Sequence, residues 1–359
     1  MEDRKKLRLG VVFGGKSDEY DVSLHSAANV LRALNEDKYD ITKIGITREG
    51  RWYVTKATPE DIENNKWIYS DSNCQCVIPH DPTVKGILVF DLEDKASVKP
   101  IDCFFPVLHG DHGEDGEIQG LFSLSEIPFV GSGVKATANS MDKTCTKQIA
   151  KLTGVKMARD YVVKSWKYKR NPEAELEAIK KVHQDKYPLF VKPSASGSSV
   201  GVTKVHKAEE LKSAVEEALK YDSKVLVEEA IKGRELEVAV LGNEEPMASG
   251  IGEILSGDEF YTYEAKYANP ESKTEFVTDL PKEVVDEFKK TAIKIYQELD
   301  CRGLSRVDFF YTNEGNIVFN EINSIPGFTN ISMYPMLWLN EGLPTDQLLD
   351  KLIAFAMEE

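Results

Sequence analysis

Four polar side chains, Arg306, Asp308, Glu321 and Asn323, alternate with apolar residues along two strand-like segments, and the two carboxylates among them could share one metal ion. These segments, SRVDFFY and NIVFNEIN, flank a turn signal at 313–316, so a symmetric hairpin pairs Asp308 with Glu321 and Arg306 with Asn323. Opposed carboxylates repel each other unless a cation lies between them, and Mg²⁺ prefers such oxygen ligands. The pattern therefore predicts a metal site; the alternative is a solvated face with an Arg-to-carboxylate pair.

The opposite face of the same hairpin is apolar. Because side chains alternate along a strand, we expect Val307, Phe309, Val318 and Ile322 to pack there as core. The segment 324–329, SIPGFT, follows directly and is a turn of small residues. Its backbone N–H groups could bind an oxyanion beside the proposed metal.

A second loop carries the residue types that bind phosphate. The predicted strand 189–192 ends at Lys192 and runs into the segment 193–201, PSASGSSVG. Backbone N–H groups, hydroxyls and an ammonium converge there, which favours a phosphate loop over a flexible linker. Val200 and Val202 predict a further strand after it.

The segment Gly10 to Ser17 matches the P-loop pattern G-x-x-x-x-G-K-[ST] letter for letter. In a P-loop the four intervening residues form the loop itself. Here Val11, Val12 and Phe13 are apolar and predict a buried strand, so we interpret the match as accidental and expect Lys16 to play no part in nucleotide binding.

The Gly-rich segment 109–116, HGDHGEDG, resembles a metal cluster in composition. Its two histidines, His109 and His112, lack the rigid helical spacing that would aim both at one ion. A substrate loop at the carboxyl edge of a parallel sheet accounts for Glu114 as well, and a plain surface turn is the alternative.

Composition and charge limit the classes of function. Apolar residues make up 41% and charged residues 29% of 359 residues, which is typical of a globular chain with two or three domains. The net charge of −15 disfavours general nucleic-acid binding, and no apolar run reaches the roughly 18 residues of a membrane span. The start of the chain lacks the apolar region of a signal peptide, so we expect a cytoplasmic protein. The five cysteines, which contain no CxxC pair, are expected to be free thiols: Cys74, Cys76, Cys103, Cys145 and Cys301.

These loops need a scaffold, and hydrophobic periodicity predicts one with three parts. A first α/β domain, residues 1–130, has strands that end in ligand loops, as in a parallel sheet. A smaller α+β part, 131–224, and a strand-rich part with flanking helices, 225–359, follow. The strands expected are 7–13, 41–46, 103–108, 158–163, 189–192, 225–229, 235–241, 306–311 and 317–322, and the helices are 141–152, 172–183, 281–299 and 345–357, besides one after Gly15.

The motifs FGGKSDEYDVSLHSA, LHGDHGEDGEIQG, SMDKTCTK, VKPSASGSSVGVTKV, YEAKY, SRVDFF and EINSIPGFTNIS occur in this order. In order and spacing they resemble the D-alanine:D-alanine ligases of the ATP-grasp superfamily, over nearly the whole chain. The resemblance implies an ATP-grasp fold with an N-terminal α/β domain. It also implies an ADP-forming ligase that makes D-alanyl-D-alanine for peptidoglycan. ATP would phosphorylate the first D-alanine, and the amine of the second would attack the acyl phosphate.

The resemblance also implies which residues bind ATP. Lys143 and Lys192 would hold its phosphates, Glu228 and the backbone near Ile231 its adenine, and Glu235 its ribose. Lys266 would reach phosphate as its loop closes over the site and excludes water. The residues expected to bind ATP are Lys143, Lys192, Gly197, Ser198, Ser199, Glu228, Glu229, Ile231, Glu235 and Lys266.

Asp308, Glu321 and Asn323 resemble the family's ligands for Mg²⁺, or Mn²⁺ in its place. Arg306 and the N–H of Gly327 resemble its oxyanion stabilisers. Glu19 matches the carboxylate that receives the first ammonium group, with Ser198 and Tyr267 as its partners, and Ser332 matches the residue that holds the second carboxylate. The expected catalytic residues are Glu19, Ser198, Tyr267, Arg306, Gly327 and Ser332. The expected substrate-binding residues are Glu19, His109, Glu114, Arg306, Gly327, Ser332 and Met333.

Two departures bear on the second substrate. Asn330-Ile331 stands where many family members have Ser-His, so a contact made by that histidine is absent or replaced. Relatives that use D-lactate have a histidine where this chain has Tyr267, which argues against lactate. Relatives that use D-serine often have an arginine where Met333 stands, so D-alanine is favoured and D-serine is the alternative.

A non-catalytic, ATP-binding sensor is the rival from another class. It is disfavoured because a competent residue occupies each catalytic position that can be matched. We also expect small-molecule substrates only, without nucleic-acid or membrane partners, and a homodimer.

Overall fold

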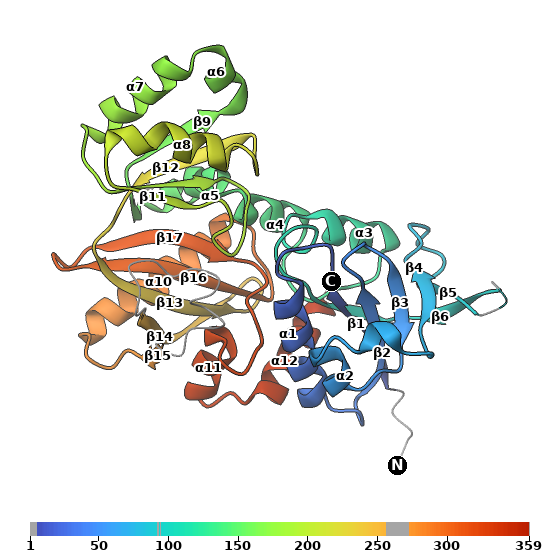
Figure 1. Cartoon of the computed structure of the whole chain (residues 1–359). Helices are drawn as coiled ribbons and strands as arrows, with labels where there is room; N and C mark the ends of the chain where they lie inside the picture. The colour runs from blue at the N-terminus through green and yellow to red at the C-terminus, as the bar shows by residue number, and fades with distance from the viewer. Residues whose placement is uncertain (1–5, 92, 94, 256–272, 359) are drawn as a thin grey trace.

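The structure, a computed structural model, describes residues 6–91, 93, 95–255 and 273–358. Within this part of the chain the strands form three sheets, of seven, four and six strands. Figure 1 shows the seven-stranded sheet on the right, the six-stranded sheet on the left and the four-stranded sheet above the six-stranded one.

The N-terminal sheet has the order β6-β5-β4-β3-β2-β1-β7. β2, β1 and β7 are parallel, as predicted, whereas β3 to β6 extend the sheet in antiparallel fashion. Only five residues separate β2 from β3, too few for the crossover that a parallel partner requires. The strands are β1 (Leu7–Gly14), β2 (Tyr39–Ile46), β3 (Trp52–Thr55), β4 (Cys74–Val77), β5 (Gly86–Phe90), β6 (Ala96–Pro100) and β7 (Cys103–Val107).

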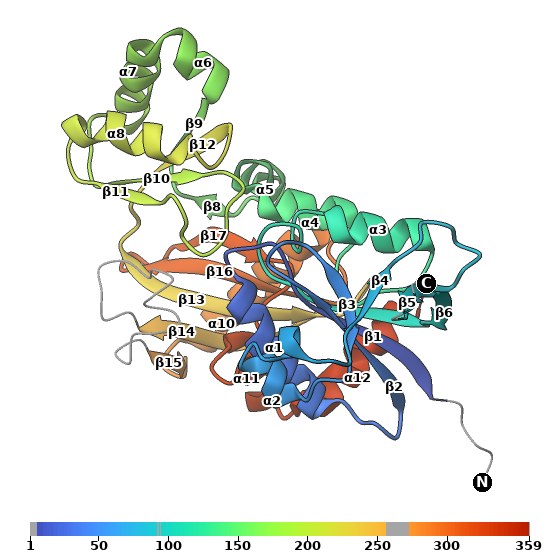
Figure 2. The ribbon, with the colours of Figure 1, turned by 45° about the vertical axis from the view of Figure 1, so that its right-hand side comes forward.

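Helices from both ends of the chain cover this sheet. The apolar residues of α12 that lie in the core, among them Leu349 and Leu352, join the same cluster as Leu24 and Val30 of α1. Figure 2 shows α12 beside the N-terminal sheet, although it is the last helix of the chain. The helices concerned are α1 (Tyr20–Ala33), α2 (Pro59–Glu63), α3 (Glu117–Ser125) and α12 (Thr345–Ala356). The helix after α3, α4 (Val134–Met141), instead joins the core of the six-stranded sheet through Ala136.

The four-stranded sheet, β11-β10-β12-β9, is antiparallel, and α6, α7 and α8 lie on its outer face (Figure 1). The strand expected after the phosphate loop is present as β11 and begins at Thr203, while Val200 and Val202 themselves still belong to the loop. The elements are β9 (Asp160–Lys164), α6 (Ser165–Arg170), α7 (Pro172–His183), β10 (Leu189–Pro193), β11 (Thr203–Val205), α8 (Ala208–Ala218) and β12 (Lys224–Glu229).

The six-stranded sheet has the order β15-β14-β13-β16-β17-β8. Its core lies against α10, through residues such as Phe288 and Ile295. The elements are α5 (Lys143–Ala150), β8 (Lys156–Met157), β13 (Gly233–Leu241), β14 (Met247–Leu255), β15 (Lys273–Phe276), α10 (Lys282–Glu298), β16 (Leu304–Thr312), β17 (Ile317–Asn323) and α11 (Met333–Asn340).

The predicted division at residues 130 and 224 stays a prediction. β12 begins at the second boundary and lies in the four-stranded sheet, while α12 lies in the N-terminal core. Two segments of the predicted third part, β12 and α12, therefore pack with the second and the first part, respectively.

The predicted pairing of the β16–β17 hairpin is confirmed at its functional end, where Arg306 faces Asn323 and Asp308 faces Glu321. Beyond that point a bulge at Asn320 shifts the register. Phe319 therefore joins Phe309 in the core, and the placement of Val318 on that face was wrong, because Val318 pairs with Phe310.

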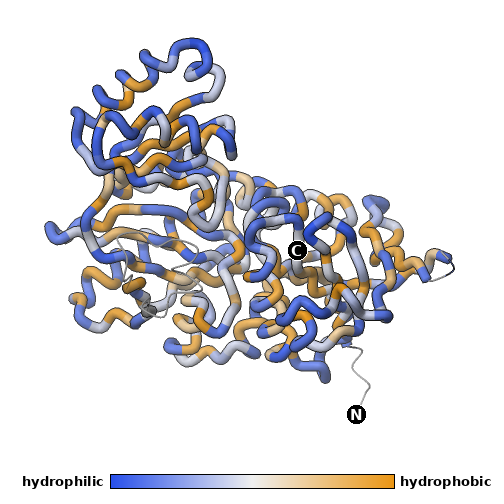
Figure 3. The backbone as a smooth tube through the Cα atoms, viewed as in Figure 1, coloured by the Kyte–Doolittle hydropathy of each residue, from blue (hydrophilic) through white to orange (hydrophobic). Residues whose placement is uncertain are grey.

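Apolar residues concentrate along the strands in each part, and hydrophilic ones along the outer turns (Figure 3). All five cysteines are free thiols, as predicted. Among the described residues, none of the helices has the length and apolar character needed to span a membrane.

Candidate active site

A cavity of about 670 Å³ opens where the three sheets meet. Every described residue that the sequence predicted for the site lines it, and they come from all three predicted parts of the chain. Lys266 and Tyr267 lie outside the described residues. The predicted residues that line the cavity are Glu19, His109, Glu114, Lys143, Lys192, Gly197, Ser198, Ser199, Glu228, Glu229, Ile231, Glu235, Arg306, Asp308, Glu321, Asn323, Gly327, Ser332 and Met333.

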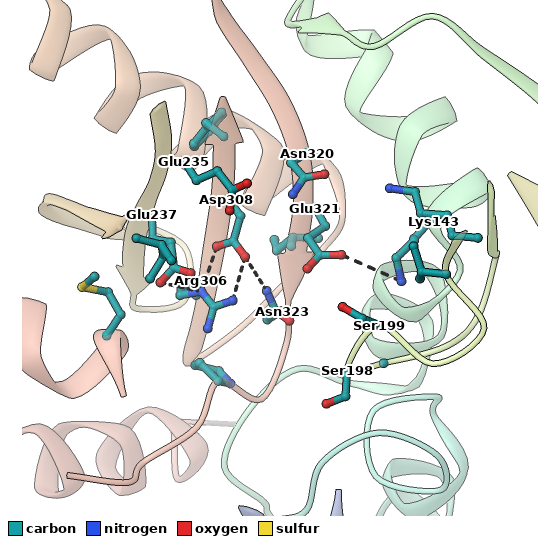
Figure 4. A pocket seen from close by; sticks show the side chains of 18 of the residues that line it. Lys143, Ser198, Ser199, Glu235, Glu237, Arg306, Asp308, Asn320, Glu321 and Asn323 are labelled. Atoms are coloured by element: carbon teal, nitrogen blue, oxygen red, sulfur yellow. Dashed lines mark hydrogen bonds and ion pairs between the residues drawn. The ribbon is translucent and has the colours of Figure 1, made fainter. Parts of the chain in front are cut away.

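The polar face of the β16–β17 hairpin forms one wall (Figure 4). Arg306 donates from Nε and Nη2 to the two carboxylate oxygens of Asp308, at 2.8 and 2.7 Å, and Asn323 donates to Oδ2 of Asp308 at 3.0 Å. Glu237 of β13 lies 3.1 Å from Nε of Arg306. Burial alone would lower the pKa of Arg306, but Asp308 and Glu237 raise it well above its ordinary value, so the guanidinium stays charged.

Glu321 points away from Asp308, towards the phosphate loop. Its Oε2 lies 3.8 Å from Nζ of Lys143, and Figure 4 shows Glu321 between Asp308 on one side and Lys143 on the other. Asp308, Asn323 and Glu321 thus present side-chain oxygens along one strand pair. Such a donor set suits a hard divalent cation completed by phosphate oxygens.

Lys143 belongs to a firmly anchored helix start. Asp142 caps α5 by accepting from the N–H of Thr144 at 3.1 Å, and it also accepts from Oγ of Ser194 at 2.6 Å. Nζ of Lys143 donates to the carbonyl of Ser196 at 2.7 Å. The helix start and the phosphate loop are therefore held together, with an ammonium group at their junction.

The phosphate loop touches the N-terminal part of the chain at Glu19. Oγ of Ser198 donates a hydrogen bond to the Glu19 carboxylate. An added Cβ at Gly197 would lie 2.5 Å from Oε2 of Glu19, so a side chain at this position would displace the Glu19 carboxylate. The expected contact between Ser198 and Glu19 is thus present.

Glu228 lies between two lysines, Lys192 of β10 and Lys147 of α5, and contacts both ammonium groups. Nζ of Lys147 also donates to the carbonyl of Ala158 at 3.0 Å. Burial by itself raises the pKa of Glu228, but the two lysines outweigh burial and lower it to about 2. Lys147 was not predicted, although its position four residues after Lys143 on a helix was a usable signal.

Glu229 also lines the cavity, but its carboxylate faces Arg159, accepting from the backbone N–H at 2.8 Å and lying 3.5 Å from the guanidinium. The Glu229 carboxylate therefore binds Arg159 at the edge of the cavity.

The segment 109–116 bends its two histidines in different directions, as expected. His109 is buried, whereas exposed His112 lies 2.5 Å from a carboxylate oxygen of Glu117. Glu114 accepts from the N–H groups of Gly110 at 3.0 Å and Ile325 at 3.1 Å. Burial and the charge of Glu19 raise the pKa of Glu114 to about 8.

The far end of the cavity is formed by the start of α11. Ser332 accepts from the N–H of Thr329 at 2.9 Å and lies 2.8 Å from its hydroxyl. Met333 packs on β14, where an added Cβ at Gly252 would overlap its sulfur. Gly252 therefore sets where the Met333 side chain lies.

Glu237 was also missed. One residue, Leu236, separates it from Glu235 on a strand, so the alternation placed both on the cavity face, and that signal was available. Ser26, which contacts His109, carried no such signal, because its partner is distant in sequence.

Two family models match the chain. The model described as D-ala D-ala ligase N-terminus matches residues 8–132, and that described as D-ala D-ala ligase C-terminus matches residues 149–354. The D-alanine–D-alanine ligase of Caldicellulosiruptor bescii is 44% identical over 355 residues, covering 99% of this chain and 96% of that protein. The Acetivibrio thermocellus ligase of the same name is 43% identical over 371 residues, with coverages of 100% and 97%.

Solved structures agree in fold. The VanG D-Ala:D-Ser ligase from Enterococcus faecalis superposes with a TM-score of 0.88 at 39% identity, covering 98% of this chain and 100% of that one. The D-alanine-D-alanine ligase from Coxiella burnetii superposes with a TM-score of 0.86 at 35% identity, covering 98% and 94%.

Proposed function

The chain belongs to the D-alanine:D-alanine ligase family, and we propose that its cavity uses ATP to join two D-alanines into the dipeptide of peptidoglycan precursors. The fold is the ATP-grasp fold of that family, with a mixed N-terminal sheet. One observation carries the proposal: the phosphate loop reaches Glu19 through Ser198, while Lys143 beside it reaches Glu321. In this proposal the subsite for the substrate's ammonium group, at Glu19, therefore lies next to the subsite for the ATP phosphates, at Lys143.

In this proposal ATP lies between the four- and six-stranded sheets. Lys143 and Lys192 bind its phosphates, and Glu228, Ile231 and Glu235 line the nucleoside end of the cavity. Lys192 contacts Glu228 before ATP arrives, and Lys147 gives Glu228 a second partner, so Lys192 can turn to phosphate without leaving a buried carboxylate unpaired.

Asp308, Glu321 and Asn323 would hold Mg²⁺, or Mn²⁺ in its place, and their oxygen atoms fit that role. Such a cation would neutralise charge on the phosphates as the γ-phosphoryl group moves. Arg306, already charged and held by Glu237, faces the same space and would stabilise negative charge on the reacting carboxyl group.

The first D-alanine would place its ammonium group at Glu19 and its carboxylate near Arg306. Phosphoryl transfer to that carboxylate releases ADP and leaves an acyl phosphate. The amine of the second D-alanine, held through its carboxylate at Ser332, attacks the acyl carbon. The tetrahedral intermediate, with its oxyanion at Arg306 and the N–H of Gly327, then loses phosphate and a proton to give the dipeptide.

D-alanine is the proposed second substrate. The curated relatives that are 42–45% identical are D-alanine–D-alanine ligases, so the D-serine alternative is not favoured, although one solved neighbour uses D-serine. Purified protein with ATP and Mg²⁺ should release phosphate only when D-alanine is added, with one dipeptide per phosphate by mass spectrometry. Tight ATP binding without release would instead support a non-catalytic sensor. A cytoplasmic location and a homodimer remain part of the proposal.

A further inference from the structure

The turn at 324–329, which carries Gly327, is held by side chains from the other end of the chain. Glu114 accepts from the N–H of Ile325 at 3.1 Å, and Nδ1 of His109 lies 3.1 Å from the carbonyl of Ile325. Both backbone groups of Ile325 are therefore engaged by the loop that follows β7.

Two residues of α1 hold Phe328 in the same way, three positions further on. Oγ of Ser26 accepts from the N–H of Phe328 at 3.1 Å, and Nδ2 of Asn29 donates to its carbonyl at 3.1 Å. Ser26 has no exposed surface, whereas Asn29 is partly exposed. α1 thus holds the second end of the turn through the backbone N–H and the carbonyl of Phe328.

One arrangement of protons satisfies the whole set. The N–H of Phe328 donates to Ser26, the Ser26 hydroxyl donates to Nε2 of His109 at 3.2 Å, and Nδ1–H of His109 donates to Ile325. This arrangement needs a neutral imidazole, and burial lowers the pKa of His109 in the same sense. His109 therefore uses both ring nitrogens on protein groups.

Only Pro326 and Gly327 lie between the two held residues. The proline ring fixes its own φ, so four hydrogen bonds and one ring leave the peptide group of Gly327 little freedom. An added Cβ at Gly327 would lie 2.9 Å from Oγ of Ser332, so the turn also lies close to the start of α11.

We infer that Ser26 and Asn29 are positioning residues that set the N–H of Gly327 for the tetrahedral intermediate, although neither needs to touch a substrate. This inference rests on the proposed function. It assigns to α1 a share in catalysis beyond Glu19: the N-terminal part of the chain places the oxyanion donor that the C-terminal part supplies. A small misplacement of such a donor is costly, because its stabilisation depends on geometry.

Two variants and one matched control test this. Ser26→Ala removes the hydroxyl from the centre of the network. Asn29→Asp replaces the donor to Phe328 by an oxygen on a partly exposed side chain, so it should fold even where Ser26→Ala is impaired. Ser23→Ala is the control, since Ser23 on the same helix is equally buried and binds Gly14 and Val107, away from the turn.

The readouts are kcat for dipeptide formation, the affinity for a phosphinate analogue of the dipeptide, whose tetrahedral phosphorus resembles the intermediate, and the Kd for ATP. For Ser26→Ala and Asn29→Asp we expect kcat and analogue affinity to fall together, by roughly ten- to a hundredfold. The Kd for ATP should stay within about twofold, because ground-state nucleotide contacts are untouched.

Unchanged kcat and analogue affinity in both variants would overturn the inference, as would an equal loss in Ser23→Ala. A wild-type chain that forms no dipeptide would instead contradict the proposed function. The two failures are therefore distinguishable.

Discussion

Arg306 and Asp308 bind each other through two parallel hydrogen bonds of 2.8 and 2.7 Å, although the proposed mechanism gives them separate partners. A cation bound at Asp308 would compete with Arg306 for the same oxygens. Glu237, 3.1 Å from Nε of Arg306, offers the guanidinium a partner when Asp308 turns to a cation. The arrangement thus lets a buried arginine and a buried carboxylate neutralise each other until substrates arrive.

Asp308→Asn should cut turnover far more than it weakens folding. Losing one cation ligand removes several kcal/mol of transition-state stabilisation, so turnover should fall at least on the order of a hundredfold. Arg306 keeps Glu237 as a partner, which limits the loss of stability. Phosphate release across a Mg²⁺ titration, with thermal unfolding in parallel, checks this, and unchanged turnover at limiting Mg²⁺ would count against the metal role.

Lys147→Met should weaken ATP binding although Lys147 is not expected to touch phosphate. Without Lys147, Glu228 would have Lys192 as its remaining lysine partner. The Glu228 carboxylate would then keep the Lys192 ammonium group away from the ATP phosphates. Removing one partner of a buried pair also costs about 3 kcal/mol of stability. Lys151→Met, in the exposed turn after α5, is the matched control. Calorimetric titrations with ATP, below the unfolding temperatures of both variants, measure this effect. Equal ATP affinities of the two variants would refute the indirect role of Lys147 in ATP binding.

Glu114→Gln should flatten the pH dependence of stability. The pKa of Glu114 is raised to about 8 in the folded protein, so the folded state keeps a proton that the unfolded state releases above its ordinary value near 4.5. Raising the pH through this range therefore favours unfolding. Between pH 5.5 and 8.5 the substrate-free wild type should lose more than about 1 kcal/mol of unfolding free energy relative to the variant. Parallel pH profiles from denaturant titrations would contradict this.

Gly252→Ala should narrow the subsite for the second amino acid. The new Cβ would displace the Met333 side chain, which lines the cavity beside Ser332. We expect kcat/KM for the second D-alanine to fall by roughly tenfold or more, and for D-serine further, because one methylene of space matters in such pockets. Gly120→Ala serves as the control, since an added Cβ there meets nothing within 4 Å. An unchanged ratio between the two substrates would argue against this role of Gly252.

Those parts of the fold and the site that depend on neighbouring residues in the chain could be predicted from the sequence. The pairing of Asp308 with Glu321 follows from turn length and alternation, and β10 leading into the phosphate loop follows from an apolar run that ends in Lys192 and small residues. The bulge at Asn320 left no comparable signal, because an extra residue in a strand changes neither composition nor polarity.

Partners distant in sequence were out of reach for a different reason. Ser26 and Phe328 are brought together only by the packing of α1 against the C-terminal turn, and the cluster that α12 shares with α1 depends on the whole fold. Helix α4 was missed because Val134–Met141 is short and weakly apolar, so its pattern does not stand out. Periodicity reports local structure, while tertiary contacts decide which buried polar groups pair.

Oxygen transfer from substrate to phosphate reports directly on the proposed acyl phosphate, because this intermediate requires the substrate carboxylate to give one oxygen to phosphate. The protein is incubated with ATP, Mg²⁺ and D-alanine labelled with ¹⁸O at both carboxylate oxygens, and the phosphate released is analysed by mass. Each phosphate should carry one ¹⁸O, and one dipeptide should form per phosphate. Unlabelled phosphate would show that water, and not the substrate carboxylate, receives the phosphoryl group, and would contradict the proposed function.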